Sequence, residues 1–103
     1  MASKKYREMP SIDKDKQFSD NGNEIVFCSI GDASTSEGIF WEALNAASVM
    51  KVPLVVLVWD DGYGISVPIE LQTTKGSISK AAEGFLIDEN GDGILIYLSL
   101  IHI

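Results

Sequence analysis

The sequence predicts an α/β fold built on a single βαβ unit, and three observations support this prediction. Residues 25–30 are almost continuously apolar, as are residues 54–59, and such runs are typical of strands covered on both faces of a parallel sheet. Between them, residues 36–51 carry apolar side chains at the spacing of an amphipathic helix. The unit therefore consists of strand, turn, helix, strand and turn, and it ends at Ser66.

The lengths of these segments favour parallel pairing of the two strands. A helix over residues 36–51 is about 24 Å long, at about 1.5 Å per residue. A strand over residues 54–59 extends about 20 Å in the opposite direction. The second strand therefore returns parallel to the first, by a right-handed crossover.

The segment before the first strand is expected to be a flexible lead-in. Residues 1–23 are polar, of mixed charge and without apolar periodicity, and they end in a turn at Asp20-Asn21-Gly22. The single cysteine, Cys28, lies within the first apolar run, so we expect a small buried hydrophobe there rather than a nucleophile. With 103 residues and a hydrophobic content of 46%, the chain is long enough for one small domain with a core.

The helix of the unit has a predicted start, a predicted apolar face and a predicted end. Ser34 and Glu37 have the spacing of a capping box, in which the two residues satisfy exposed amides at the helix start. Pro53 ends the helix because the residue before a proline disfavours the α region. The apolar stripe that is expected to face the core consists of Phe40, Ala43, Leu44, Ala47 and Met50.

Beyond Ser66 the sequence is less regular. Residues 67–68 and 73–76 are expected to form an extended loop. A short helix is predicted over residues 78–85, with Ser77 as its N-terminal cap.

The last part of the chain contains an acidic turn and an unusual tail. Residues 88–93 match the first half of an EF-hand loop, but Ser99 stands at the twelfth position, where a bidentate Glu is needed. We therefore predict a hairpin turn followed by a strand over residues 94–97. Residues 98–103 read LSLIHI, which is a forward translation of a transposase mosaic-end adaptor. Our hypothesis is that this tail is not native, so His102 is not interpreted as a catalytic base.

Acidic residues follow both predicted strands of the unit. Asp32 comes directly after the first strand, and Asp60-Asp61 comes directly after the second. We expect these carboxylates at one edge of the sheet, because the carboxyl ends of parallel strands form the ligand-binding crevice of open α/β sheets. No Lys or Arg lies between Gly31 and Met50, so the edge suits a hard divalent cation. The alternative is that Asp32 caps a turn and that the aspartate pair lies in a solvated loop.

This stretch resembles the thiamine diphosphate-binding motif of 2-oxo acid dehydrogenases, in the alpha part of the decarboxylating component. That motif begins Gly-Asp-Gly and ends Asn-Asn; here the two ends are Gly31-Asp32-Ala33 and Asp60-Asp61, followed by the segment Gly62-Tyr63-Gly64-Ile65-Ser66. The sequence is most similar to branched-chain forms, including those that fuse alpha and beta parts. The resemblance implies that residues 24–97 are a fragment of a parallel-sheet, transketolase-like thiamine diphosphate-binding domain.

The resemblance also implies a ligand set at the edge of the sheet. Mg²⁺ would be held by the side chains of Asp32 and Asp61 and by the backbone carbonyl of Tyr63, and Ala33 would lie near the diphosphate. Gly31 and Ile65 are further cofactor-binding positions. Asp61 is preferred over Asp60 because successive side chains alternate in direction. Amides at the helix start carry partial positive charge, which suits a diphosphate oxygen.

Two positions depart from the motif. Ala33 replaces a glycine, which is tolerable in a turn that needs no positive φ. The Asp60-Asp61 pair replaces Asn-Asn and adds negative charge beside an anionic diphosphate, so the metal or an outside cation must offset it. Ligation itself is retained, because a carboxylate oxygen binds Mg²⁺ at least as well as an amide oxygen.

The implied parent enzyme oxidatively decarboxylates a branched-chain 2-oxo acid and passes the acyl group to a lipoyl-bearing acyltransferase. A beta part or subunit would complete the active site, and the fragment alone is expected to be inactive. No catalytic side chain is assigned within this chain, because the acid that activates the aminopyrimidine belongs to the missing partner.

Two alternatives to the dehydrogenase interpretation remain open from the residues. One is a Mg²⁺-binding receiver-type phosphoacceptor domain, although its further aspartate and lysine are not visible. The other is a non-enzymatic acidic interaction domain. A net charge of −7 argues against nucleic acid as a partner. No secretory signal or membrane span is evident, so we expect no membrane contact and a cytoplasmic location.

Overall fold

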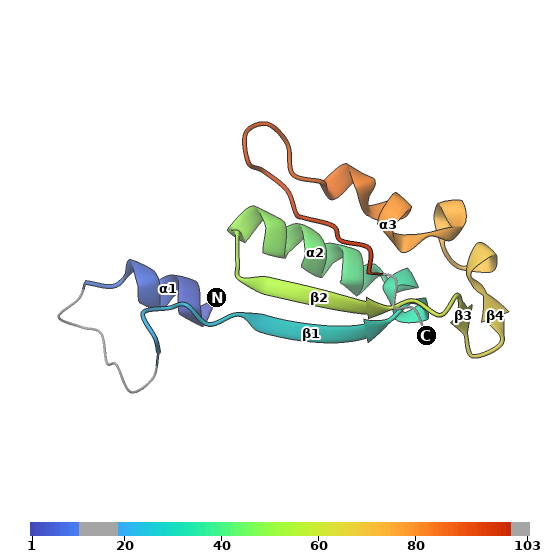
Figure 1. The fold of residues 1–103 in the computed structure, drawn as a ribbon, viewed down its shortest axis with the longest axis horizontal. Coiled ribbons are helices and arrows are strands. Elements are labelled where there is room, and N and C mark those ends of the chain that lie inside the picture. Colours follow the sequence, from blue (N-terminus) through green and yellow to red (C-terminus); the bar gives the residue numbers. More distant parts are fainter. Residues whose placement is uncertain (11–18, 100–103) are drawn as a thin grey trace.

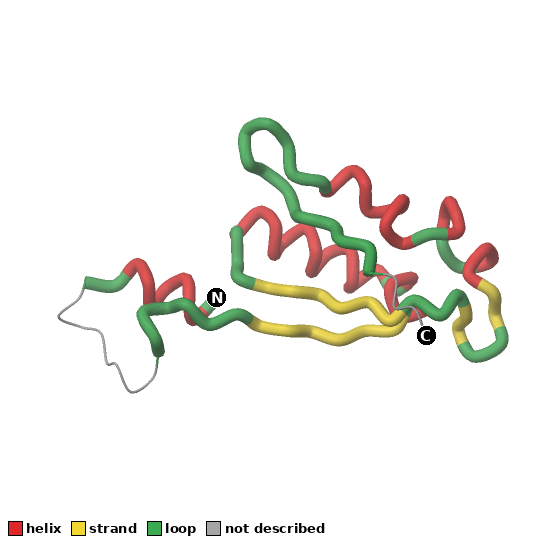
Figure 2. Tube along the Cα trace, in the orientation of Figure 1, coloured by secondary structure: helices red, strands yellow, loops and turns green. Residues whose placement is uncertain are grey.

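The computed structural model describes residues 1–10 and 19–99 of the chain (Figure 1). Figure 2 shows the helices and strands along the trace. The elements in chain order are α1 (Ala2–Glu8), β1 (Val26–Gly31), the 3₁₀ turn η2 (Ala33–Ser36), α2 (Gly38–Met50), β2 (Leu54–Trp59), β3 (Tyr63–Gly64), β4 (Val67–Pro68), the 3₁₀ turns η3 (Ile69–Leu71) and η4 (Thr74–Gly76), α3 (Ile78–Ala81) and the 3₁₀ turn η5 (Ala82–Phe85).

The predicted βαβ unit is confirmed. β1 and β2 pair in parallel, with a register that runs from Val26 opposite Leu54 to Gly31 opposite Trp59. β2 has the predicted bounds, and β1 is shifted by one residue. α2 carries the chain from the end of β1 back to the start of β2 (Figure 1). It is shorter than predicted, because the residues before Gly38 form the separate turn η2.

The predicted capping box is wrong. Ser34 lies inside η2, and Glu37 precedes α2 without a side-chain hydrogen bond to the helix amides. Asp32 caps η2 instead, because its side chain accepts a hydrogen bond from the backbone N–H of Ala33. At its other end, α2 stops before Pro53 at Lys51, which adopts the left-handed conformation with φ 49°.

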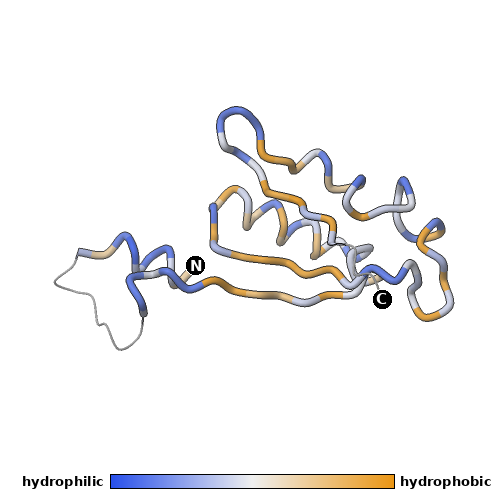
Figure 3. The backbone as a smooth tube through the Cα atoms, viewed as in Figure 1, coloured by the Kyte–Doolittle hydropathy of each residue, from blue (hydrophilic) through white to orange (hydrophobic). Residues whose placement is uncertain are grey.

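The hydrophobic core is much smaller than expected. Among the described residues, the buried apolar side chains are those of Ile78 and Ala82. Both strands are apolar (Figure 3), but β1 is largely exposed, with Phe27 66% exposed, and β2 is mostly half-buried. The radius of gyration is 16.7 Å, compared with about 13 Å for a compact domain of about 100 residues. A parallel sheet is normally covered by helices on both faces. The single helix of this unit covers one face of the sheet and leaves the other uncovered.

Several burial predictions are therefore wrong. Residues 25–30 are not covered on both faces, and Cys28 is exposed rather than buried. In the apolar stripe of α2, Ala43 and Met50 are exposed. The remaining stripe residues, Phe40, Leu44 and Ala47, are half-buried.

The N-terminal segment contains a helix that the sequence does not predict. Lys4 Nζ donates to the Met50 carbonyl at 2.7 Å, and Arg7 donates to the Gly22 carbonyl at 2.6 Å, so α1 is tied to both α2 and the following turn. The predicted turn at residues 20–22 is confirmed by the hydrogen bond from the Asn23 N–H to the Asp20 carbonyl at 3.0 Å. Residues 11–18 lie outside the described part, so the flexible lead-in stays a prediction there.

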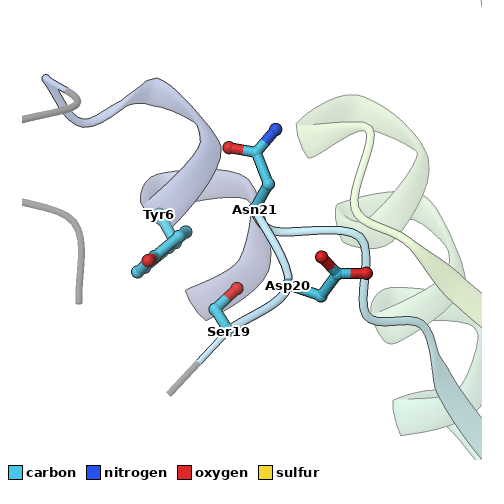
Figure 4. Close-up of a pocket in the computed structure, with 4 residues that line it drawn as sticks. All are labelled: Tyr6, Ser19, Asp20 and Asn21. Atoms are coloured by element: carbon cyan, nitrogen blue, oxygen red, sulfur yellow. The ribbon is translucent and has the colours of Figure 1, made fainter. Parts of the chain in front are cut away.

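A cavity of about 410 Å³ lies between α1 and this turn, lined by Tyr6, Ser19, Asp20 and Asn21 (Figure 4). It lies before β1, at the opposite end of the sheet from Asp32. Within the described residues, no helix has the length and apolar character needed to cross a membrane.

The segment after β2 is more structured than the loop that was predicted. β3 and β4 form a short antiparallel hairpin, and the turns η3 and η4 follow it. The predicted helix over residues 78–85 is present as α3 followed by η5, and the Ser77 hydroxyl accepts a hydrogen bond from the Lys80 N–H as expected. The rings of Trp41 and Phe85 stack with centroids 6.2 Å apart, which packs this segment on α2.

The acidic segment at residues 88–93 is a turn, as predicted. The Asp88 carboxylate accepts hydrogen bonds from the N–H groups of Asn90 and Asp92, and the bond from Asp92 contributes most to lowering the pKa of Asp88. The Asp92 carboxylate also forms an exposed ion pair with Lys51 at 2.9 Å.

The predicted strand over residues 94–97 does not form. Ile94 makes one isolated bridge with Leu86, and residues 95–97 belong to no strand. Residues 98–99 are in an irregular, exposed segment, and residues 100–103, with His102, lie outside the described part. The hypothesis of a non-native tail stays a prediction.

Two buried threonines lead to opposite predictions. The Thr35 hydroxyl donates to the Asp32 carbonyl at 2.5 Å, whereas the Thr73 hydroxyl has no partner within the described residues. We expect Thr35→Val to lower the free energy of unfolding by about 1 kcal/mol and Thr73→Val to leave it unchanged or raise it. Urea denaturation of both variants tests this, and equal losses would show that the Thr73 hydroxyl does have a partner.

Candidate functional site

The candidate site lies where β1 and β2 end. Gly31 and Trp59 are the last paired residues of the two strands, and the Asp32 N–H donates to the Trp59 carbonyl at 3.1 Å. Asp32 and the Asp60-Asp61 pair therefore follow the two strands at the same edge of the sheet, which confirms the predicted arrangement. The register of the parallel pair places the starts of the two acidic loops at the same end of the sheet.

The Asp32 carboxylate joins the two loops at this edge. One oxygen accepts a hydrogen bond from the Ala33 N–H at 2.9 Å, and the other accepts one from the Gly62 N–H at 3.1 Å. The residue is only 3% exposed. Asp32 thus caps a turn, as the alternative interpretation states, and it also contacts the loop that carries Asp61. Because each ionised carboxylate oxygen accepts more than one interaction, these bonds leave room for a cation.

The two aspartates after β2 differ in their contacts. Both are exposed, but the Asp61 carboxylate accepts a hydrogen bond from the Tyr63 N–H at 3.0 Å. Gly62, which lies between Asp61 and Tyr63, has φ 80°, a conformation that favours glycine. Asp61 therefore orients the residue whose carbonyl is the third predicted metal ligand.

Ile65 stands at the tip of the hairpin formed by β3 and β4. Its side chain is fully exposed, and its backbone has φ 60°, which is unusual for a β-branched residue. Strained backbone of this kind is concentrated at functional sites. The observation is compatible with the predicted cofactor contact of Ile65.

The amides at this edge offer a place for an anion. Gly31 is the last residue of β1, and a Cβ at this position would meet no atom within 4 Å. The Ala33 N–H is already bound to Asp32. At the start of α2, however, Glu37 provides no side-chain cap, and the Phe40 N–H donates to the Glu37 carbonyl at 3.1 Å, so the amides that suit an anion are those of Gly38 and Ile39.

The donor set suits a metal that completes its shell with outside oxygens. The described residues contain no group of three or more His, Cys, Asp or Glu side chains that could hold a metal ion. Asp32, Asp61 and the Tyr63 carbonyl supply three ligating groups. Mg²⁺ usually binds through one or two carboxylates together with phosphate oxygens and waters, so the residues fit this ion in chemistry.

Sequence reasoning missed three contacts at the site. The Gly62 N–H bonds to Asp32 from 30 residues away, and Thr35 is 1% exposed beneath that aspartate. Gly64 lies against Ala33 and Gln72. A Thr three residues after Asp32 is a sequence signal for the second contact, because such hydroxyls bond to nearby backbone. The first and third contacts depend on how separate loops meet.

The chain is similar to known proteins. Residues 1–90 match the family model described as "Dehydrogenase E1 component". The alpha subunit of 3-methyl-2-oxobutanoate dehydrogenase from Mycobacterium tuberculosis is 38% identical over 63 residues, covering 61% of this chain and 17% of the relative. The alpha subunit of 2-oxoisovalerate dehydrogenase from Bacillus subtilis is 36% identical over 60 residues, covering 58% and 18%.

A third relative widens the range of named activities. The alpha subunit of acetoin:2,6-dichlorophenolindophenol oxidoreductase from Bacillus subtilis is 34% identical over 61 residues, covering 59% of this chain and 18% of the relative. The chain therefore spans less than a fifth of the length of these relatives. No solved structure matches it at a significant level. These matches favour the dehydrogenase interpretation over the receiver-type domain and the acidic interaction domain.

Proposed function

This chain belongs to the dehydrogenase E1 component family, and on that premise we propose that it forms part of a thiamine diphosphate- and Mg²⁺-binding domain. The parent enzyme oxidatively decarboxylates a 2-oxo acid and transfers the acyl group to a lipoyl domain. A branched-chain 2-oxo acid is the proposed substrate, since two of the relatives above are named for such acids.

The position of Asp32 is the observation that carries this proposal. Its carboxylate is held between two loops, at the carboxyl ends of two parallel strands, by the N–H groups of Ala33 and Gly62. Ligands of open α/β sheets bind in this crevice. The buried Asp32 carboxylate offers a group for a cation, and the start of α2, which has no side-chain cap, offers amides for an anionic ligand, as a metal-bound diphosphate requires.

Each residue has a proposed role in holding the cofactor. Asp32, Asp61 and the Tyr63 carbonyl hold Mg²⁺, while Gly31 and Ala33 lie along the diphosphate. Ile65 supplies an apolar contact from the tip of the hairpin. Thiamine diphosphate, when bound, supplies the stabilisation of the carbanion that decarboxylation requires. The side chains of this chain bind and orient the cofactor.

The proposed partners follow from the same premise. A beta part or subunit completes the pocket around the other end of the cofactor, and a lipoyl-bearing acyltransferase receives the acyl group. The enzyme acts on a small 2-oxo acid in the cytoplasm, without nucleic acid or a membrane as a partner. The transketolase-like fold of the complete domain is part of the proposal.

We expect the complete enzyme to bind thiamine diphosphate only when Mg²⁺ is present, and the isolated chain to bind it weakly or not at all. The isolated chain provides the metal and diphosphate contacts, but the other half of the pocket is absent. Calorimetric titration of both proteins, with and without EDTA, tests this expectation. Binding by the complete enzyme in EDTA, or by the isolated chain with a Kd below about 1 μM, would contradict the proposal.

A further inference from the structure

We propose that Ala33 and Gly64 form a size-matched pair that positions the Tyr63–Gly64 peptide beside Asp32. The effect of this pair on Mg²⁺ binding rests on the proposed function, because the carbonyl of that peptide is the third proposed Mg²⁺ ligand. The pair itself is a property of the fold and can be tested without a cofactor.

The steric part of the pair is visible in the approach of β3 to η2. A Cβ built on Gly64 would lie 2.7 Å from the Cβ of Ala33. Carbon atoms in contact prefer a separation of about 3.5–4.0 Å. The Ala33 Cβ is attached directly to the backbone of η2 and has no rotamer through which to withdraw. A side chain at position 64 would therefore displace the hairpin or η2.

The side-chain amide of Gln72 is the other close neighbour of Gly64, and it can move more easily than the Ala33 Cβ. The same built Cβ would lie 2.8 Å from Gln72 Oε1, but that atom is the end of a flexible side chain. The Gln72 backbone is held in place, because the Ser36 hydroxyl donates to its carbonyl at 2.9 Å. The side-chain amide donates to the Val67 carbonyl at 3.4 Å, a long contact that can change. Ala33 is thus the decisive neighbour.

Space, and not backbone conformation, is the reason for a glycine at position 64. The glycines of this chain with positive φ include Gly62, Gly76 and Gly91, but not Gly64. An alanine at position 64 would therefore meet no strain in its own backbone. The absence of a side chain serves the close contact with Ala33.

The contact has a direct consequence for the candidate ligands. The Tyr63 carbonyl belongs to the peptide that ends in the Gly64 nitrogen, so any shift of Gly64 moves that oxygen. Immediately before it, the Gly62 N–H is bonded to the Asp32 carboxylate. The family motif has a glycine at the position of Ala33. The extra methyl group here occupies the space that a side chain at position 64 would need, so the two positions compensate each other.

A double-mutant cycle followed by hydrogen exchange of the amides of residues 62–68 tests the pair in the complete enzyme without cofactor. We expect Gly64→Ala to raise the exchange rate about tenfold, which is about 1.4 kcal/mol and within the usual effect of overpacking. In the double variant Ala33→Gly/Gly64→Ala the rate should return to within about threefold of the parent, because the colliding methyl group is gone.

Two matched glycine variants serve as controls. Gly84 has open space around its Cβ position and no positive φ, so Gly84→Ala should leave exchange at residues 62–68 unchanged. Gly62 also has open space, but its φ is 80°. Gly62→Ala should therefore raise exchange through backbone strain, and Ala33→Gly should not rescue it.

A Mg²⁺ titration of thiamine diphosphate binding then tests the consequence for the ligands. Gly64→Ala should raise the Mg²⁺ concentration at half-saturation about tenfold, and the double variant should restore it. If the parent enzyme does not bind the cofactor, the proposed function fails, and the exchange cycle still decides whether the pair holds the peptide. The inference is overturned if the double variant exchanges as fast as Gly64→Ala alone. It is also overturned if Gly64→Ala titrates like a parent that binds.

Discussion

Asp32→Ala is expected to abolish cofactor-dependent activity in the complete enzyme and, at the same time, to loosen the edge of the sheet. The substitution removes a proposed Mg²⁺ ligand. It also leaves the half-buried N–H groups of Ala33 and Gly62 without their acceptor, and a fully buried unsatisfied donor costs about 1–3 kcal/mol, so we expect a loss near the lower end of that range for each. Activity, bound thiamine diphosphate and the free energy of unfolding should all fall together.

Asp32→Asn separates the two effects. Asparagine keeps one side-chain oxygen as an acceptor, but its NH₂ group cannot accept a hydrogen bond. We therefore expect stability between that of the parent and that of Asp32→Ala, with cofactor binding weakened further than stability.

Cys28→Ala is the control for the Asp32 variants, and its exposed side chain should change stability by no more than about 0.5 kcal/mol. Equal loss of activity in Cys28→Ala and Asp32→Ala, at matched amounts of folded protein, would count against the metal assignment.

Asp61→Leu is expected to lose the cofactor at any practical Mg²⁺ concentration, whereas Asp61→Asn is expected to keep it. Leucine removes both the proposed ligand and the acceptor that holds the Tyr63 N–H at 3.0 Å. Asparagine keeps an oxygen for both interactions and removes one negative charge near the diphosphate. Cofactor affinity of Asp61→Asn should therefore stay within about tenfold of the parent, a difference of about 1.4 kcal/mol.

The neighbouring aspartate is the matched control for this second prediction. Asp60 is also exposed at the end of β2, but it is not a proposed ligand. Asp60→Asn and Asp60→Leu should both be nearly silent in a Mg²⁺ titration of activity. If Asp60→Leu lost activity and Asp61→Leu titrated with Mg²⁺ like the parent, Asp60 would be the ligand in place of Asp61.

Much of the βαβ unit could be predicted because its signals are local. The apolar run over β2, the helical spacing of α2 and the lengths of both elements require a parallel return of the chain, and the observed register confirms it. The position of Asp32 and Asp61 at one edge follows from the same reasoning, because each residue closely follows the end of its strand.

The errors concern features that depend on neighbours. The strand expected at residues 94–97 is missing because a strand needs a paired edge, and Ile94 finds only one bridging residue. Cys28 is exposed although its segment is apolar. An apolar strand is buried only where another layer of the protein packs on it. The capping box fails because the Asp32 side chain caps η2 two residues earlier than Ser34, which lies inside that turn.

The order of the strands and the helix, their approximate bounds and the placement of acidic residues after each strand follow from the sequence alone. Periodicity, segment length and turn residues act within a few residues of one another, so they can be recognised without coordinates. The bond between Asp32 and the Gly62 N–H, and the lack of room for a side chain at Gly64 beside Ala33, depend on the three-dimensional packing. These contacts join residues about 30 positions apart, and their distances depend on the register that brings the two loops together.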